Sequence, residues 1–303
     1  MTGREVNLEP LTLSAVLPFS LSSVLRSHGW IQLAPCDTDE THSFLGRVER
    51  LGSGRVVEML AREVDGSVLV EAAGALSESE RVELGCKVGW MLGLDQDLTS
   101  FYALARQEPK LAQMEGKAQG RILRSPTLFE DTVKTILTTN TAWSGTIRMV
   151  GNLVSGFGSP LPRDPSRHAF PTPGQLARTD EETLRAHAGL GYRAPYVLQL
   201  AQEVAELTLD LESLKAADIP TAELRKRLLA IKGVGDYAAA NLLMILGRYD
   251  YIPVDSWALK MVSHEWYDGE PVGRGEVEQA FERWGEWQGL AFWCWDWSHK
   301  SPG

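Results

Sequence analysis

Apolar and polar positions alternate in short runs along the first ninety residues, a pattern typical of half-buried β-strands. The runs are Gly29–Leu33, His42–Leu51, Val56–Val64 and Ser67–Ala72. Asp65-Gly66, between the last two runs, is a strong signal for a two-residue hairpin turn. We therefore predict a three- or four-stranded antiparallel meander, followed by a helix that opens with a capping box at Ser77 and Glu80.

From about residue 96 the apolar positions follow the 3.6-residue period of α-helices. One helical face carries Phe129, Val133, Ile136 and Leu137, a second Val197, Leu200, Val204 and Leu207, and a third Leu224, Leu228, Leu229 and Ile231. Residues Ala238–Leu246 are almost entirely apolar, as expected of a buried helix, and Thr179 with Glu182 predicts another capping box. The proline-rich stretch Ser155–Pro173 is expected to be a loop.

These patterns predict a mainly α fold with a small antiparallel β N-terminal domain (α+β). We place the β-rich domain at residues 1–95 and an all-α domain at 96–303. Cys36, Cys86 and Cys294 are too few and too far apart to hold an iron–sulfur cluster. No apolar run is long enough to span a membrane, and the N-terminus lacks a secretory signal. We expect an intracellular protein of the cytoplasm or nucleoid, with no membrane partner.

The formal net charge of −10 argues against a protein that binds nucleic acid through bulk positive charge. The charge is uneven, however. Residues 37–97 carry 13 acids and 6 bases, whereas 101–151 carry 7 bases and 4 acids and 221–262 carry 6 bases and 4 acids. An acidic protein can therefore still present a local basic face.

The most informative segment is the hairpin Ile231-Lys232-Gly233-Val234-Gly235, which joins two predicted helices within residues 224–246. We expect a turn too tight for side chains at either glycine, with Val234 plugged back between the helices. The second helix starts at about Asp236, and the N–H groups of a helix N-terminus suit a phosphate oxygen. Taken alone, the same residues fit an ordinary helix–helix turn equally well.

About twenty residues later the chain reads Ile252-Pro253-Val254-Asp255-Ser256-Trp257. Asp255 lies at the expected start of a further helix, where an aspartate most often serves as an N-cap. The combination of the hairpin, the buried helix and Val-Asp is far more specific than any of its parts.

From Arg121 to Val262 the sequence resembles the helix–hairpin–helix DNA glycosylase superfamily, whose members excise damaged bases. The resemblance implies that the hairpin grips the DNA backbone, often with a bound alkali cation (K⁺ or Na⁺), and that Asp255 is the catalytic carboxylate. Gly189-Leu190-Gly191-Tyr192-Arg193-Ala194 and Thr138-Thr139-Asn140-Thr141 resemble segments of the oxoguanine/alkylpurine (3-methyladenine) branch. The second match places Asn140 against the gap that the extruded base leaves.

Bifunctional members carry a lysine two residues after the second glycine of the hairpin, where this chain has Tyr237. A phenol cannot form an imine with the sugar, so the resemblance implies a monofunctional enzyme that uses water. Lys232 and Lys260 are nearby in sequence, but we interpret both as phosphate-facing charges.

Five of the ten tryptophans are concentrated in residues 284–297: Trp284, Trp287, Trp293, Trp295 and Trp297. Most of them are expected to pack in a terminal helix. One or two could instead stack on an extruded base, since aromatic faces attract cationic purines. The candidates for the base pocket are Trp293, Trp257 and Tyr237.

The expected partner is double-stranded DNA with a damaged base, bound by a monomer. Its phosphates would be held by backbone N–H groups at Gly233 and Gly235 and by Lys232, Arg193 and Lys134, while Arg193 fits an acidic partner equally well. The leading hypothesis is a monofunctional glycosylase for alkylated purines. The alternatives are an oxoguanine glycosylase and a helix–hairpin–helix protein that binds DNA without catalysis.

Overall fold

The computed structural model describes residues 10–254 and 256–295. They form two compact units, each built from two separate stretches of the chain. The sheet unit comprises residues 10–97 and 121–211, and the hairpin unit comprises 98–120 and 212–295 without 255. This division differs from the expected boundary at residue 95, because the helices of 128–205 belong with the N-terminal sheet and 98–120 belong with the C-terminal helices.

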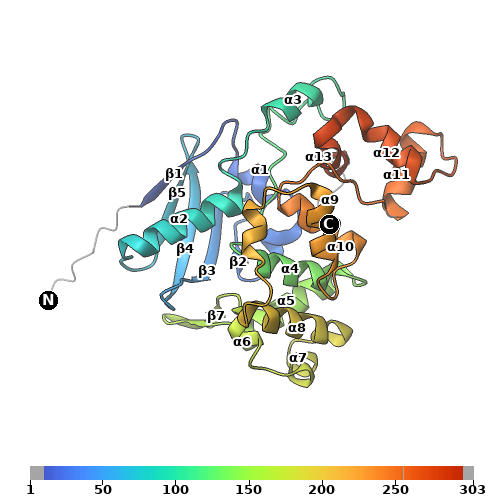
Figure 1. The fold of residues 1–303 in the computed structure, drawn as a ribbon. Coiled ribbons are helices and arrows are strands. Elements are labelled where there is room, and N and C mark those ends of the chain that lie inside the picture. Colours follow the sequence, from blue (N-terminus) through green and yellow to red (C-terminus); the bar gives the residue numbers. More distant parts are fainter. Residues whose placement is uncertain (1–9, 255, 296–303) are drawn as a thin grey trace. The chain divides into compact units, whose positions relative to one another are not determined.

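The sheet unit holds a β-sheet, several helices and a small second sheet (Figure 1). Its elements are β1 Leu11–Ser14, α1 Leu21–Leu25, η1 Gly29–Gln32, β2 Cys36–Asp37, β3 Phe44–Arg50, β4 Val56–Val64, β5 Ser67–Ala72, α2 Glu78–Leu92, α4 Leu128–Thr138, α5 Trp143–Phe157, β6 Pro160–Leu161, β7 Asp164–His168, α6 Pro173–Leu176, α7 Glu181–His187, η2 Gly191–Arg193 and α8 Ala194–Ala205.

The main sheet is antiparallel with strand order β1-β5-β4-β3-β2. The β4–β5 hairpin turns at Asp65-Gly66 as predicted, with Val64 paired to Ser67 and both turn residues at positive φ. Five strands replace the predicted three or four because the short edge strands β1 and β2 have few alternating positions to reveal them. The predicted strand Gly29–Leu33 is wrong: residues Gly29–Gln32 form the 3₁₀ helix η1, with Trp30 and Ile31 buried.

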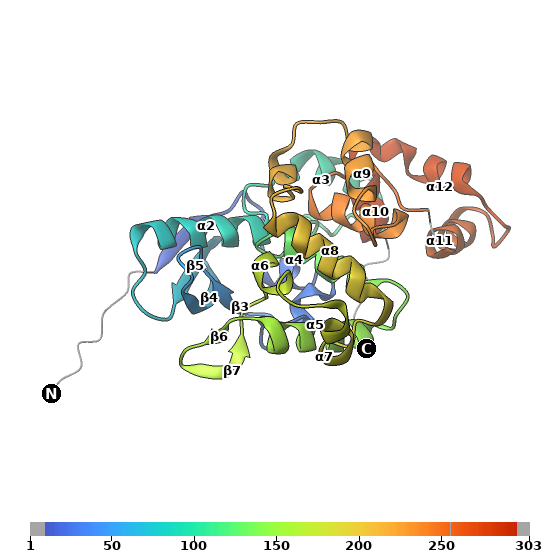
Figure 2. The same ribbon diagram turned by 60° about the horizontal axis from the view of Figure 1, so that its bottom comes forward.

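Helix α2 lies along the main sheet in both views (Figures 1 and 2). It begins with the predicted capping box, in which Ser77 and Glu80 bond each other's backbone N–H groups. The capping box predicted at Thr179 and Glu182 is wrong, because Asp180 caps α7 instead by accepting from the N–H of Thr183 at 2.7 Å. An aspartate one residue closer to the helix outcompetes the threonine.

Helices α5, α6, α7 and α8 pack together in the other part of this unit (Figure 2). The predicted loop Ser155–Pro173 is wrong at residues 155–157, 160–161 and 164–168. Helix α5 continues to Phe157, and β6 pairs with β7, so the region after residue 96 is not purely α. Leu207 does not belong to the α8 stripe, because α8 ends at Ala205 and Leu207 is 88% exposed.

A buried network of charged side chains fixes α4 against the sheet. Arg47 on β3 donates to both carboxylate oxygens of Glu130 on α4, at 3.0 and 2.6 Å, and to Glu49 at 2.7 Å. Lys134 pairs with Glu130 at 2.7 Å and donates to Ser125 at 3.2 Å. Lys134 is therefore buried in this network, and the expectation that it contacts a DNA phosphate is wrong.

The regular elements in the described residues of the hairpin unit are all helices (Figure 1). Its elements are α3 Thr99–Ala105, η3 Glu212–Ala216, α9 Thr221–Leu229, α10 Asp236–Ile245, α11 Ser256–Trp266, α12 Arg274–Phe281, η4 Glu282–Trp287 and α13 Gln288–Cys294. From Ala238 to Leu246 every residue except Asn241 is buried, as the apolar sequence predicts. None of the helices in residues 10–254 and 256–295 has the length and apolar character that a membrane crossing requires.

The tryptophans of the C-terminal segment form part of this unit's core. Trp284 is 2% exposed and its ring centroid lies 5.9 Å from that of Phe101, while Trp287 stacks on Tyr249 at 5.6 Å. Trp295 is also buried, with its ring 6.4 Å from that of Trp284. The packing role predicted for most of these rings is confirmed for Trp284 and Trp295, whereas Trp297 lies outside the described residues.

Candidate nucleic-acid interface

At Gly233 and Val234 the hairpin between α9 and α10 has the expected geometry. Gly233 adopts φ +89°, a conformation that L side chains rarely adopt, so this position requires glycine. Val234 is 5% exposed and its N–H donates to the carbonyl of Ile231 at 3.0 Å, which confirms the predicted plug. Lys232 is exposed at the tip of the turn.

Gly235 differs from the expectation of a turn too tight for any side chain. It is the N-cap of α10 with φ −93°, and a Cβ at this position would meet no atom of the protein within 4 Å. The fold itself therefore does not require glycine at 235. The open space lies at the start of a helix, where N–H groups lack intrahelical partners and an anion is favoured. A backbone without a side chain there lets a partner approach closely.

Asp236 and Tyr237 occupy the first turn of α10. Asp236 pairs with Arg225 of α9, whose guanidinium carbon lies 5.0 Å from the ring centroid of Tyr251. Tyr237 is 47% exposed, and its carbonyl accepts from Asn241 at 2.8 Å. Tyr237 thus lies at the surface beside the hairpin.

Asp255 lies outside the described residues, so its expected role rests on the sequence alone. The residues on either side of it are described. Trp257, in the first turn of α11, is partly buried, and its ring meets that of Phe292 edge-on at 5.3 Å. It also lines a cavity of about 840 Å³ that includes Lys260, Met261 and Trp295. Trp293 is partly buried on α13 and does not line this cavity, so the structure does not bring the three proposed pocket aromatics together there.

In the sheet unit, Asn140 follows the end of α4 in the left-handed conformation, with φ +46°. Its side chain is exposed and donates to the hydroxyl of Tyr192 at 3.3 Å. Tyr192 is 47% exposed and was not singled out from the sequence as a site residue. Its place in the Gly-Leu-Gly-Tyr-Arg stretch, next to two glycines at positive φ, was the available signal.

The buried side chain of Arg193 contacts the backbone at Asn140 and the ring of Tyr192. Its side chain is 6% exposed, and it donates to the carbonyls of Thr139 and, at 3.2 Å, Asn140. Its guanidinium also lies 4.4 Å from the ring centroid of Tyr192. Among the described residues Arg193 pairs with no acidic side chain, and its contact with a DNA phosphate stays a prediction. Arg193 donates to the carbonyls of Thr139 and Asn140, which follow α4, and so holds the turn that presents Asn140.

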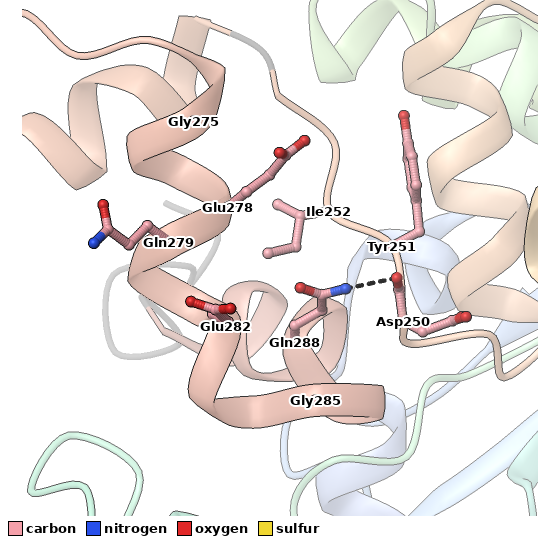
Figure 3. A pocket seen from close by; sticks show the side chains of 9 residues that line it. All are labelled: Asp250, Tyr251, Ile252, Gly275, Glu278, Gln279, Glu282, Gly285 and Gln288. Carbon is pink, nitrogen blue, oxygen red and sulfur yellow. Dashed lines mark hydrogen bonds between the residues drawn. The ribbon is translucent and has the colours of Figure 1, made fainter.

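A second pocket in the hairpin unit, of about 690 Å³, has the wrong charge for DNA (Figure 3). The described residues that line it include the carboxylates Asp250, Glu278 and Glu282 but no lysine or arginine. One wall is closed by Gln288, whose amide donates to the carbonyl of Asp250 at 2.6 Å (Figure 3). A row of carboxylates repels phosphate, so this pocket is no part of a nucleic-acid interface.

No group of three or more histidine, cysteine or acidic side chains in the described part of the chain is arranged to hold a metal ion. The hairpin residues 231–235 contain no carboxylate, so an alkali cation there would be held by backbone carbonyl oxygens. Such oxygens are the ligands that K⁺ accepts in other proteins. The donor chemistry of the hairpin therefore fits the cation that the resemblance implies, which stays a prediction.

Comparison with known proteins agrees with this geometry. Residues 133–286 match the model of the HhH-GPD superfamily base excision DNA repair protein. DNA-3-methyladenine glycosylase of Bacillus subtilis is 27% identical over 210 residues, covering 67% of this chain and 68% of that protein.

Solved structures share the fold over most of the chain. The 3-methyladenine DNA glycosylase of Archaeoglobus fulgidus has a TM-score of 0.71 at 23% identity, covering 96% of this chain and 98% of that one. The 8-oxoguanine glycosylase/lyase of Clostridium acetobutylicum, bound to double-stranded DNA, has a TM-score of 0.67 at 19% identity and covers 90% and 92%. The chain is a DNA glycosylase of the HhH-GPD superfamily of base excision DNA repair proteins.

Proposed function

We propose that this glycosylase is monofunctional and hydrolyses the N-glycosidic bond of an alkylated purine in double-stranded DNA. The observation that carries the proposal is Tyr237 in the first turn of α10, where bifunctional members of the family have their nucleophilic lysine. A phenol offers no amine to attack the sugar C1′, so water takes that role. The Bacillus subtilis relative, named as a 3-methyladenine glycosylase, supports the same substrate class.

Binding begins at the hairpin. The N–H groups at the start of α10 and the exposed Lys232 would hold a phosphate of the DNA backbone, and the open space at Gly235 lets that phosphate approach. An alkali cation on the hairpin carbonyls would add positive charge at the same place. The damaged nucleotide then swings out of the duplex, which costs a few kcal/mol.

Asn140 and Tyr192 are proposed to face the gap that the extruded nucleotide leaves. Both side chains are exposed and bonded to each other, and the buried Arg193 fixes the backbone beneath them. The amide of Asn140 can both donate to and accept from an orphaned base. The phenol ring of Tyr192 can stack on a neighbouring base.

Asp255 is proposed as the catalytic carboxylate. Cleavage of the glycosidic bond passes through an oxocarbenium-like state, and a nearby carboxylate stabilises that positive charge. The same carboxylate can orient water or accept its proton as it attacks C1′. The electron pair of the broken bond leaves with the base. A cationic alkylated purine leaves as a neutral molecule, so it needs little further assistance, and Trp257, Trp293 and Tyr237 are the aromatic candidates to hold it.

Substituting Asp255 by asparagine tests this role, because asparagine keeps the shape and can still cap a helix. Asp255→Asn should retain DNA affinity and slow base release by about a hundredfold or more under single-turnover conditions. Asp250→Asn is a matched control, because Asp250 is five residues earlier and its carboxylate accepts from the hydroxyl of Thr221 at 2.7 Å. Full excision by Asp255→Asn would contradict the assignment, and loss of binding and stability together would indicate a structural role that needs the carboxylate.

An oxoguanine glycosylase is the second candidate. The Gly189–Arg193 stretch folds into the turn that holds Asn140, and the Clostridium acetobutylicum neighbour with this fold is named for that activity. A base-release assay on duplexes with alkylated purines, hypoxanthine, ethenoadenine, oxoguanine or uracil separates the two. Strand breaks only after alkali, with no borohydride-trapped complex, support the monofunctional enzyme. A trapped complex would mean that a lysine acts as nucleophile, and no release from any duplex would favour a non-catalytic DNA-binding protein.

A further inference from the structure

Two segments distant in sequence meet at a very close contact beside residues 139–142, the turn that carries Asn140. A Cβ on Gly29 would lie 2.2 Å from Cζ2 and 2.6 Å from Cη2 of Trp143, so the indole ring lies against the backbone of Gly29. Gly29 does not adopt a positive φ, and glycine is therefore needed here for the close approach rather than for its backbone angle. We propose that Trp143 is a positioning residue for base extrusion, because its ring on Gly29 fixes the start of α5 next to Asn140.

The indole ring makes a second contact with the same helix. Its Nε1 donates to Oε1 of Gln32 at 2.6 Å. Gly29 and Gln32 are the first and last residues of η1, so Trp143 contacts both ends of this 3₁₀ helix. These three residues form what we call the η1–α5 contact, and all of them belong to the sheet unit.

The start of α5 relies on this contact because it lacks a side-chain cap. The N-cap residue Ala142 makes no side-chain hydrogen bond, and Trp143 is the first residue of the helix. Helix starts are commonly fixed by a side chain that accepts from the free N–H groups. In place of such a cap, the ring of Trp143 anchors the first residue of α5 to η1.

Helix η1 is itself attached to α4. Trp30, the residue after Gly29, is buried, and its Nε1 donates to Oδ1 of Asp131 in the first turn of α4 at 2.8 Å. The ring of His28 lies 4.6 Å from that of Trp30, and its Nε2 lies 2.7 Å from the carbonyl oxygen of Leu123. The start of α5 is therefore connected through η1 to the start of α4.

Asn140 lies on the segment that this connection closes. Its φ of +46° is a left-handed conformation, which costs free energy in a residue other than glycine and persists only where the surroundings enforce it. Arg193 donates to the carbonyls of residues 139 and 140, and Trp143 fixes the chain three residues after Asn140. With both sides held, Asn140 is placed before DNA arrives, and less conformational entropy is lost when its side chain enters the gap.

This role of Trp143 rests on the proposed role of Asn140 and concerns the extrusion step. A turn that samples several conformations is competent for only a fraction of the time, and the rate of extrusion falls by that fraction. A damaged base that faces an abasic analogue has no pairing partner and leaves the stack at lower cost. Loss of the η1–α5 contact should therefore slow base release from a paired duplex more than release of the same base opposite the abasic analogue.

Single-turnover base release by the full chain tests the contact in a double-mutant cycle. Trp143→Ala removes the ring and Gly29→Ala displaces it, so each should slow release from the paired duplex by about tenfold. The two together should slow it no more than Trp143→Ala does alone, because both break the same contact. Trp143→Phe keeps a ring on Gly29 without the N–H and should lose less. Gly151→Ala on α5 is the matched control, because a Cβ there meets nothing within 4 Å.

The unpaired substrate separates positioning from general damage to the fold. With the damaged base opposite the abasic analogue, Trp143→Ala and Gly29→Ala should be slowed by about threefold or less. Equal slowing on both substrates, with a lower urea midpoint, would overturn the positioning role. Additive effects of the two substitutions would overturn the contact. If Trp143→Ala does not fold, Gly29→Ala and Trp143→Phe carry the same comparison.

A binding measurement distinguishes failure of this role from failure of the proposed function. A parent chain that releases no alkylated purine would contradict the proposed substrate. A duplex with the abasic analogue in place of the damaged nucleotide still presents the gap, and no base has to leave. Trp143→Ala should bind this duplex about tenfold more weakly than Gly151→Ala does, whereas equal affinity of the two variants would overturn the role of Trp143.

Discussion

Two neighbouring carboxyl groups of α4 are both buried, but their pKa values shift in opposite directions. Asp131 is fully buried, and its Oδ1 accepts from Trp30 at 2.8 Å and from the N–H of Ser125 at 2.9 Å, while Oδ2 has no hydrogen-bond partner. Burial raises the pKa of Asp131 to about 6. Burial also opposes ionisation of Glu130, but Arg47 and Lys134 lower the pKa of that carboxyl to about 2.

Asp131→Asn should therefore stabilise the protein above pH 6. The folded state binds the Asp131 proton more tightly than the unfolded state does. The contribution of Asp131 to the free energy of unfolding is therefore fully present below its unfolded pKa of 3.8 and is lost as the pH rises through about 6. The free energy of unfolding of Asp131→Asn, measured in urea, should exceed that of the parent by about 2–3 kcal/mol at pH 8. This advantage should shrink towards pH 4.

Glu130→Gln is the matched comparison, because its expected effect on stability at neutral pH has the opposite sign. Glu130 contributes stability above its unfolded pKa of 4.5, and that contribution is lost only as the pH falls towards 2. Removing its charge leaves Arg47 buried without this partner and should cost about 3–5 kcal/mol at neutral pH. A pH-independent effect of Asp131→Asn would contradict the raised pKa.

Single residues also show why sequence reasoning succeeded at the hairpin and failed beneath Asn140. Gly233 and Val234 act within a few residues of each other, so the motif alone predicts their geometry. Lys134 pairs with Glu130 four residues earlier, a pair that is buried together with Arg47 of β3, and the partners of Arg193 are backbone carbonyls of a distant segment. From sequence alone a charged residue is predicted to be exposed. It can be buried only where the fold provides partners for its charge.

At the level of elements, the segment that leads to Asp255 is held by the start of α13. The N–H of Gly289 donates to the carbonyl of Tyr249 at 2.6 Å, and the neighbouring Gln288 donates to that of Asp250 (Figure 3). A Cβ on Gly289 would lie 2.4 Å from the carbonyl oxygen of Tyr251 and 2.8 Å from that of Tyr249. The two backbones approach too closely for any other residue.

Gly289→Ala should therefore separate α13 from residues 249–251. We expect a loss of about 3 kcal/mol in the free energy of unfolding and slower single-turnover base release, because this segment precedes Asp255. Gly275→Ala on α12 is the matched control, since a Cβ there meets nothing within 4 Å. That variant should be unchanged or slightly more stable. Similar behaviour of the two variants would show that the close approach is unimportant.

The elements predicted from sequence were those with long, regular patterns. The β4–β5 hairpin, α2, α4 and α10 were expected where they occur, since each carries its full period and a turn or cap. Gly29–Leu33 is apolar because Trp30 and Ile31 are buried, but five residues cannot separate a strand from a 3₁₀ turn. The short strands β6 and β7 are likewise too brief to show alternation.

In the molecule as a whole, the negative net charge opposes binding to DNA. An acidic protein that grips DNA mainly through N–H groups and a few lysines makes few ionic contacts. The logarithm of its affinity for duplex DNA should fall with the logarithm of salt concentration with a slope of roughly −3 to −5. Lys232→Ala should reduce that slope by about 1, measured by fluorescence anisotropy. Affinity that is independent of salt would contradict phosphate binding by the hairpin.

The interleaving of the two units also orders events on the ribosome. The sheet unit is complete in sequence once residue 211 has been made, so it can fold while synthesis continues. Residues 98–120 emerge before the second half of the sheet unit but belong with helices made after it, and Phe101 finds Trp284 and Trp287 only once residues 284–287 have been made. The apolar side chains of this segment therefore remain without these partners while residues 121–283 are synthesised, which exposes them to aggregation during that interval.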